Sequence, residues 1–312
     1  MAKAIREVYG EALVKYGRDN PDVVVLDADV SGSTRSALFQ AACPERFFNV
    51  GVAEANMSGM AAGFASVGKI PFVNTFATFL TTLGLLPARV FGSYSSLNVK
   101  FMGAYGGLSD AYDGPSHHAI EDLAIMRALP NFRVYAASDE VHTDWLVKHA
   151  IESKGPMYIR LSRDVFPDLY ESGAKFEDGK GNVLRDGKDV TIAACGIMIG
   201  FALEAAKILT SEGIDAKVID VFSVKPLDAA LLLESARSTG AIVTAEEHSI
   251  IGGLGGAVSE VLALEQACVP VGFVGLADCH AECGSYKELL GKYQLDVPAI
   301  VAKVRETVAK KR

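Results

Sequence analysis

Apolar residues in the first half of the chain follow two alternating spacings. Residues 4–16 place apolar side chains on one face of a predicted helix, whereas the run at 23–26 is continuous and predicts a strand buried on both faces. Further strands are predicted at 47–50, 70–73, 99–102, 133–136 and 158–161. Further helices are predicted at 53–66, 78–90 and 119–128, and after Ser138, which is expected to cap one. This alternation predicts a doubly wound, mainly parallel sheet.

The pattern is interrupted once and then starts again. Residues 174–188 carry glycine and aspartate breakers without apolar periodicity, so we expect them to link two domains. Strands and helices alternate again over 189–312, and the last helix has apolar residues on one face. The sequence therefore predicts an α/β fold of two doubly wound domains, 1–173 and 189–312, with mainly parallel sheets.

Composition and charge narrow the functional classes. The chain has 312 residues, 50% of them hydrophobic and 22% charged, which is typical of a globular protein. Its net charge of -8 argues against nucleic acid or anionic lipid as a partner, and no segment reads as a signal peptide or a membrane span. Five scattered cysteines fit a reducing cytoplasm, where we expect the protein. Cys279 and Cys283 flank His280, but the spacing matches no standard zinc pattern, so we predict no metal ligands in this chain.

Polar groups gather in the loops that follow the predicted strands, where open α/β sheets bind ligands. The first such segment contains Asp27 and Asp29, followed by an expected Ser/Gly loop at 31–33. Its carboxylates either cap the next turn or face a ligand. Glu54 opens a predicted helix. It is either an ordinary first-turn residue favoured by the helix dipole, or a desolvated carboxylate whose raised pKa suits proton exchange.

Three further segments carry candidate chemistry. Phe76 and Phe79 are predicted on one helical face, either as core residues or as a flat surface for a heterocycle. The loop at 106–118 is long and dense in ionisable groups, as functional loops often are. Arg163 follows a strand and either forms a surface ion pair or binds a phosphate. The glycines of 252–256 are better explained by close helix packing than by a nucleotide loop.

Taken together, these segments resemble the transketolase family of thiamine-diphosphate enzymes. The resemblance is most specific at Gly51–Glu54, at the aromatic pair of Thr75–Phe79 and at Asp113–His117, and it covers nearly the whole chain in order. It implies the pyrimidine-binding and C-terminal domains of that family. The matching spacing also includes Arg6, Asp29 and Ser33.

The resemblance implies a role for each matched residue. Glu54 corresponds to the glutamate that hydrogen-bonds a ring nitrogen of the cofactor's aminopyrimidine and so promotes loss of the thiazolium proton. Phe76 and Phe79 correspond to the aromatic wall around the pyrimidine, and Asp29 lies near the cofactor. The implied substrate contacts are Arg6, Ser33 and Arg163 for the sugar phosphate, Asp113 for a sugar hydroxyl, and His117 for oxygen atoms and proton transfer.

Three departures from the family pattern concern the substrate. Ala55 and Asn56 follow Glu54 where the family often has histidine, and Tyr105 stands where a substrate-facing histidine is common. Tyr135 precedes Ala136 where an Arg-Pro pair is often found. Because two cationic groups are lost, the substrate preference is expected to differ from a standard sugar phosphate, whereas the cofactor chemistry is expected to be kept.

The diphosphate half of the implied cofactor site is missing. The family binds diphosphate and Mg2+ through a Gly-Asp-Gly segment, and this sequence contains none. The resemblance therefore implies a separate N-terminal transketolase subunit that holds most of the metal site, in an α2β2 assembly. The expected reaction is transfer of a two-carbon ketol unit from a ketose phosphate to an aldose phosphate, as in the pentose phosphate pathway.

Three other functions share parts of this pattern. The β subunit of a 2-oxoacid dehydrogenase has the same two-domain plan, but the Asp113–His117 motif and Leu161–Arg163 favour transketolase. A synthase that joins pyruvate to a triose phosphate normally carries all domains in one chain. A non-catalytic assembly subunit would have no need of Glu54 beside Phe76 and Phe79.

Overall fold

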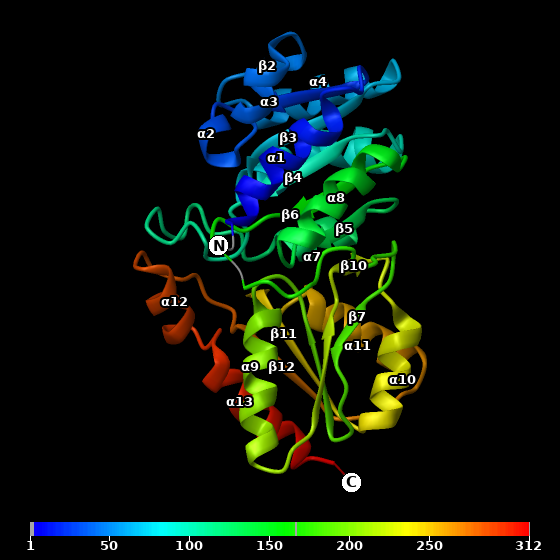
Figure 1. Cartoon of the computed structure of the whole chain (residues 1–312), viewed down its shortest axis with the longest axis vertical. Helices are drawn as coiled ribbons and strands as arrows, with labels where there is room; N and C mark the ends of the chain where they lie inside the picture. Colours follow the sequence, from blue (N-terminus) through cyan, green and yellow to red (C-terminus); the bar gives the residue numbers. More distant parts are fainter. Residues whose placement is uncertain (1–2, 166, 312) are drawn as a thin grey trace.

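Two β-sheets organise the chain, which a computed structural model describes at residues 3–165 and 167–311 (Figure 1). The first sheet has the order β10 (Ser223–Lys225), β5 (Arg133–Ala136), β6 (Met157–Arg160), β4 (Lys100–Ala104), β3 (Ile70–Phe76), β1 (Val23–Asp27) and β2 (Phe47–Asn49). The second has the order β12 (Val271–Leu276), β11 (Ile242–Ser249), β8 (Val190–Ala194), β9 (Ala216–Asp220) and β7 (Asn182–Arg185). Only β10 and β7 pair antiparallel among these strands, which confirms the prediction of two mainly parallel sheets.

Helices accompany both sheets. Those of the first domain are α1 (Ile5–Gly17), α2 (Ser31–Thr34), α3 (Ala37–Ala42), the 3-10 turn η1 (Pro44–Arg46), α4 (Glu54–Ser66), α5 (Ala77–Thr82), α6 (Leu85–Pro87), the π-helical η2 (Ala88–Tyr94), α7 (Asp122–Ala128) and α8 (Glu140–Glu152). Those of the second domain are α9 (Met198–Ser211), α10 (Ala229–Thr239), α11 (Leu254–Leu264), α12 (Tyr286–Lys292) and α13 (Val297–Val308). Among the described residues, none of these helices is long and apolar enough to cross a membrane.

The β1 strand shows why the apolar run at 23–26 is continuous. Val24 and Leu26 pack in one hydrophobic cluster, whereas Val23 and Val25 pack in another. Successive side chains of a strand point to opposite faces, so a strand covered on both sides needs apolar residues at every position. The β1 strand, which lies between β3 and the edge strand β2, is thereby fixed between two layers. Its carboxyl end lies at the edge where open α/β sheets generally bind ligands.

Several local predictions were wrong. Residues 31–33 begin α2 instead of forming a loop, because the buried Asp27 accepts hydrogen bonds from Val30 N and Thr34 Oγ1 and so closes the turn. The helix expected at 78–90 is divided into α5, α6 and η2. Pro87 lies at this division, and proline cannot donate the backbone hydrogen bond that a continuous helix requires.

The helix after β5 is capped by a different residue from the one expected. Asp139, and not Ser138, accepts a hydrogen bond from His142 N, at 2.8 Å. Ser138 Oγ instead donates to Asp220 Oδ2 across the domain boundary, at 2.6 Å. The serine therefore joins the two domains.

The chain path between the domains is more interwoven than the sequence indicates. The segment 174–188 contains β7, which pairs with β9 of the second sheet. After β9 the chain returns to the first sheet as β10, which pairs antiparallel with β5 (Figure 1). The first sheet is therefore completed by a strand that follows the second domain's β9.

The second domain also holds the long loop at 106–118. Glu247 Oε1 accepts hydrogen bonds from Leu108 N at 2.7 Å and from Tyr286 OH at 2.9 Å. Gly107 has φ +66°, and a Cβ there would lie 2.2 Å from the Glu247 carboxyl carbon, so only glycine fits. Gly284 N donates to Ala111 O at 3.1 Å. The loop's position is thus set by both domains.

The glycine-rich segment at 252–256 packs as predicted. The buried Glu246 accepts hydrogen bonds from Leu254 N at 2.7 Å and Gly255 N at 2.8 Å, so this carboxylate already occupies the N-terminus of α11. A Cβ on Gly255 would lie 2.5 Å from the Phe273 ring. The glycines permit close packing of α11 on the sheet, and no room for a nucleotide phosphate is left at this helix end.

Candidate functional site

The carboxyl ends of the central strands of the first sheet meet at one edge. Phe76 at the end of β3 pairs in register with Ala104 at the end of β4, and Asp27 of β1 pairs with Asn74 of β3. Phe76, Ala104 and Tyr105 form a small buried cluster of their own at this edge. Parallel strands therefore bring loops that are distant in sequence to a common place.

Aromatic rings gather at this edge of the first sheet. The rings of Phe76 and Phe79 lie 5.9 Å apart, and Phe76 lies 4.6 Å from the ring of Tyr105. His117 packs edge-on against Phe79, with ring centroids 5.0 Å apart. The two phenylalanines do not share a helical face, because Phe76 ends β3 and caps α5, yet the strand-to-helix junction still brings them together. The arrangement offers an apolar surface with an imidazole at its border.

Tyr105 lies between two guanidinium groups. Arg6 lies 5.6 Å and Arg163 lies 5.3 Å from the centre of its ring, both within the range of cation–π contacts. Arg6 Nη1 also donates to the Tyr105 hydroxyl at 2.5 Å and to the Ser33 carbonyl oxygen at 3.4 Å. Tyr105 has φ +60°, an uncommon conformation for a bulky residue, at the end of β4. The structure thus gathers Arg6, Ser33 and Arg163 around the tyrosine.

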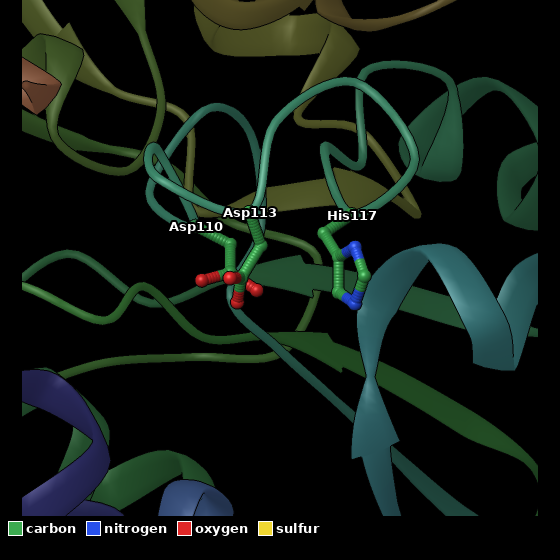
Figure 2. A group of neighbouring side chains, drawn as sticks. All are labelled: Asp110, Asp113 and His117. Atoms are coloured by element: carbon green, nitrogen blue, oxygen red, sulfur yellow. The ribbon is translucent and has the colours of Figure 1, made fainter. Parts of the chain in front are cut away.

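Three ionisable side chains of the 106–118 loop lie together, as Figure 2 shows. Ligand atoms of Asp110, Asp113 and His117 all lie within 4.8 Å of one another, a spacing that suits a cation or a shared proton. Burial raises the pKa of Asp110 to about 6, and the neighbouring Asp113 carboxylate adds to this shift. Arg163 Nη1 lies 3.3 Å from Asp110 Oδ1 and opposes the shift. Asp110 therefore takes up a proton near pH 6, much closer to neutrality than an ordinary aspartate.

Asp110 is the main residue that sequence reasoning missed. Its side chain is 1% exposed, whereas Asp113 is exposed and His117 is half-buried. Its carboxylate oxygen Oδ2 is buried and has no hydrogen-bond partner within residues 3–165 and 167–311. The only available signal was its place in the ionisable loop, because nothing in the spacing shows which aspartate turns inward.

Adjacent histidines of the same loop have different environments. His118 is buried, and neither ring nitrogen finds a hydrogen-bond partner in the part of the chain that the structure describes. Burial lowers the pKa of His118, so its ring is neutral at physiological pH. His117 lies on Phe79 and contacts Ser116 Oγ through Nδ1 at 3.0 Å. His117 is therefore the histidine of this pair that reaches the site.

The two aspartates after β1 have also separated. Asp27 is fully buried and caps the following turn, and burial raises its pKa. Asp29 is exposed, has φ +67° and accepts a hydrogen bond from Asn49 Nδ2 at 2.8 Å. Capping therefore accounts for Asp27, whereas a role of the exposed Asp29 beside a ligand stays a prediction.

Glu54 is the first residue of α4 and its side chain is 5% exposed. Among residues 3–165 and 167–311, no group donates a hydrogen bond to this carboxylate. Its neighbours are open to the surface: Ala55 and Asn56 are exposed, and Val52 is 78% exposed. Although the residue as a whole is buried, its carboxylate oxygens are not sealed from solvent, so water can satisfy them. The N-terminus of α4 is a favourable place for a carboxylate.

Tyr135 lies in a different environment from Tyr105. It is fully buried in the hydrophobic cluster of α1 and β5, its hydroxyl donates to Asp178, and its ring packs edge-on against His149 at 5.9 Å. The tyrosine at this position is therefore a core residue. In the described part of the chain, Cys279, His280 and Cys283 do not come together as a set of three metal-ligand atoms.

Both parts of the chain match known protein families. Residues 1–167 match the family described as "Transketolase, pyrimidine binding domain", and residues 179–300 match "Transketolase, C-terminal domain". This chain belongs to the transketolase family. The family members use thiamine diphosphate, and the match confirms the predicted resemblance and fold.

Relatives of different lengths resemble this chain over nearly all of its residues. A solved structure titled "Split gene transketolase, inactive beta4 tetramer" has a TM-score of 0.90 and 50% identity, with 100% of both chains covered. The 6-deoxy-6-sulfo-D-fructose transketolase subunit SqwH of Clostridium sp. (strain MSTE9) is 39% identical over 98% of this chain and 95% of its own length. Human transketolase is 36% identical over 98% of this chain, which spans only 49% of that protein. The chain is thus similar to subunits of split transketolases.

Proposed function

We propose that this chain is the pyrimidine-binding subunit of a thiamine-diphosphate-dependent transketolase, which transfers a two-carbon ketol unit from a ketose phosphate or a related anionic ketose to an aldose phosphate. The observation that carries the proposal is Glu54, a residue only 5% exposed at the start of α4, whose carboxylate accepts no hydrogen bond from the described chain and can still be reached from outside. In a transketolase fold, such a carboxylate is ready to accept a hydrogen bond from a bound ring.

The residues present fit the pyrimidine half of the cofactor. Glu54 offers a carboxylate acceptor, Phe76 and Phe79 offer an apolar wall, and Asp29 lies exposed after β1. Thiamine diphosphate would supply the carbanion that carries the two-carbon unit. Glu54 would share a proton with a ring nitrogen and orient the ring, while the phenylalanines would exclude water from its face.

The substrate would lie beside the aromatic residues, near Arg6 and Arg163. Arg6 and Arg163 would bind its anionic end together with Ser33, since guanidinium groups are strong donors to such oxygens. Asp113 would accept a hydrogen bond from a sugar hydroxyl. His117, half-buried on Phe79, would bind substrate oxygen and move a proton at its ring nitrogen.

A second chain would complete the site. The sequence has no Gly-Asp-Gly segment, so a partner would bind the diphosphate and Mg2+. Large apolar side chains lie exposed beside α4 and along the α5–η2 segment, which fits a surface covered in an assembly. They are Val52, Leu83, Leu86 and Tyr94. We propose an α2β2 complex in which Glu54 and its open neighbours face the partner.

Co-purification from the native source tests this proposal. A partner carrying the diphosphate motif should accompany the chain, and the complex should transfer ketol units when thiamine diphosphate and Mg2+ are added. The isolated chain should show no transfer and should bind the cofactor poorly. Activity of the chain without a partner would contradict the split site, and release of carbon dioxide from 2-oxoacids would identify a 2-oxoacid dehydrogenase subunit instead.

A further inference from the structure

The two guanidinium groups beside Tyr105 do not present their full charge to a ligand. Arg163 is paired with Asp110, whose Oδ1 lies 3.3 Å from Arg163 Nη1. Arg6 Nη1 already donates hydrogen bonds to the Tyr105 hydroxyl and the Ser33 carbonyl oxygen. Arg6 Nε is buried and has no hydrogen-bond partner within residues 3–165 and 167–311. Donors therefore remain for an anion, but one of the two positive charges is already compensated.

Carboxylates approach these guanidinium groups from two segments. Asp110 comes from the 106–118 loop and is 1% exposed, so solvent screens its charge little. Asp164 follows Arg163 directly and is half-buried; burial raises its pKa, while Arg163 and Arg6 oppose that shift. Asp113 lies against Asp110, as Figure 2 shows. Tyr105, whose ring lies within cation–π distance of both arginines, adds no positive charge.

The balance of these charges decides which anion fits. A phosphate ester carries about -1.5 to -2 near pH 7, because its second pKa is about 6. Such an end, placed on Arg6 and Arg163, would also face Asp110, whose carboxylate is ionised at pH 7.5 even though burial raises its pKa to about 6. In a partly buried site the repulsion between these like charges is strong. A sulfonate has a similar shape and three oxygen acceptors but keeps a single negative charge. It matches two guanidinium groups of which one is compensated.

We propose that Asp110 is a specificity-determining residue that favours ketoses with a monoanionic end, of the sulfonate type, over ketoses with a phosphate. The inference rests on the proposed function and defines its substrate class. Asp110 acts by lowering the net charge beside Arg163, and it does so without touching the reacting carbons. Specificity of this kind comes from a repulsive element against the wrong ligand as well as from attraction to the right one.

Competing ketol donors test the inference in the reconstituted complex. We would measure kcat/KM near pH 7.5 for fructose 6-phosphate and for the analogue in which a sulfonate replaces the phosphate, with uncharged glycolaldehyde as the acceptor. The sulfonate should be preferred by the natural chain. Asp110→Asn, which keeps the shape and removes the charge, should raise the phosphate-to-sulfonate ratio about tenfold. Asp186→Asn, which removes an exposed carboxylate in the second domain, should leave the ratio unchanged.

The outcomes separate this inference from the function on which it rests. Transfer with a clear preference for phosphate in the natural complex would overturn the inference, even if Asp110→Asn failed to fold. A ratio that Asp110→Asn leaves unchanged would overturn it as well. If the complex transferred no ketol unit from either donor or from other ketoses, the proposed function itself would be wrong.

Discussion

Arg160 and Arg163 leave the same strand, β6, close together in sequence, and the fold uses them in opposite ways. Arg160 is 7% exposed; Nη2 donates to the carbonyl oxygens of Ala119 at 3.0 Å and Glu247 at 2.7 Å, and Nε lies 3.1 Å from Asp122 Oδ2. Arg163 is 38% exposed and makes one ion pair, with Asp110. An arginine whose N–H groups are all used within the protein holds the fold together, whereas one with N–H groups still available can bind a ligand.

The carboxylates at the strand ends of the two sheets differ in the same way. In the second domain, Asp220 accepts hydrogen bonds from Ser138 and Tyr170, and Glu246 caps α11. In the first domain, Asp29 is exposed and Glu54 has no donor in the described chain. The second domain uses these carboxylates to hold the fold together. The first domain does the same with Asp27, which closes the turn after β1, but it leaves Asp29 exposed.

The largest effect is expected at Glu54. Glu54→Gln keeps the side chain's shape but removes the carboxylate that would share a proton, so ketol transfer by the reconstituted complex should fall by about 100- to 10,000-fold. Steady-state kinetics would measure this loss, and thermal unfolding should show that the fold is kept. Glu212→Gln, an exposed change at the end of α9, serves as the matched control. Full activity of Glu54→Gln would indicate a non-catalytic subunit.

Arg160 should matter for stability instead. Arg160→Met leaves Asp122 buried without its ion-pair partner, which is expected to lower the free energy of unfolding by about 3–5 kcal/mol. Urea denaturation followed by circular dichroism would measure this. Arg163→Met is the comparison and should cost less, because Arg163 is partly exposed and Asp110, whose pKa burial already raises to about 6, can take up a proton when its partner is lost. Equal losses for the two variants would remove the distinction drawn between them.

The buried Asp220 should make the free energy of unfolding depend on pH. Burial raises its pKa to about 7 from the ordinary 3.8. The folded chain therefore keeps a proton that the unfolded chain releases, and stability falls as the pH rises from 3.8 to about 7, by up to about 1.4 kcal/mol per pH unit. Asp220→Asn lacks this slope. Between pH 5 and pH 7, the free energy of unfolding measured with urea should fall by about 1–3 kcal/mol more for the natural chain than for the variant. Parallel curves would show that Asp220 is ionised in the fold.

The smallest of these effects concerns Arg163 in binding. Arg163→Met removes one donor for the anionic end of the substrate, so KM for an anionic ketose should rise about tenfold while kcat changes less. The measurement is a comparison of anionic and uncharged ketoses in the reconstituted complex. If KM for the uncharged ketose rose equally, Arg163 would act on the fold of the loop and not on the anion.

The sequence predicted the parts of the fold that depend on periodicity. Alternating apolar spacings identified the main strands and helices, because a strand such as β1 must be apolar at every position when both faces are covered. Elements that depend on tertiary contacts were missed. The short β10 and α12 carry little periodic signal. The sequence also could not show that Asp139 caps α8, because this depends on Ser138 being bonded to Asp220 in the other domain.

For the candidate site, the resemblance identified residues that the fold then gathered. Arg6, Ser33 and Arg163 are far apart in sequence, and only the parallel sheet places them around Tyr105. The sequence did not show that Asp110 turns inward or that Tyr135 belongs to the core. Those facts depend on which face of a loop or strand is covered by the rest of the chain. The assigned roles of Glu54, His117 and the other site residues stay predictions.

The return of the chain to the first sheet as β10 has a consequence for dissecting the protein. A fragment that ends at residue 173 would leave β5 as an edge strand with unpaired amide and carbonyl groups. Such an edge can pair with another copy of the fragment and cause aggregation. The complementary fragment would carry an orphan strand. The two halves are therefore expected to melt as a single cooperative unit, and neither is a promising candidate for independent expression.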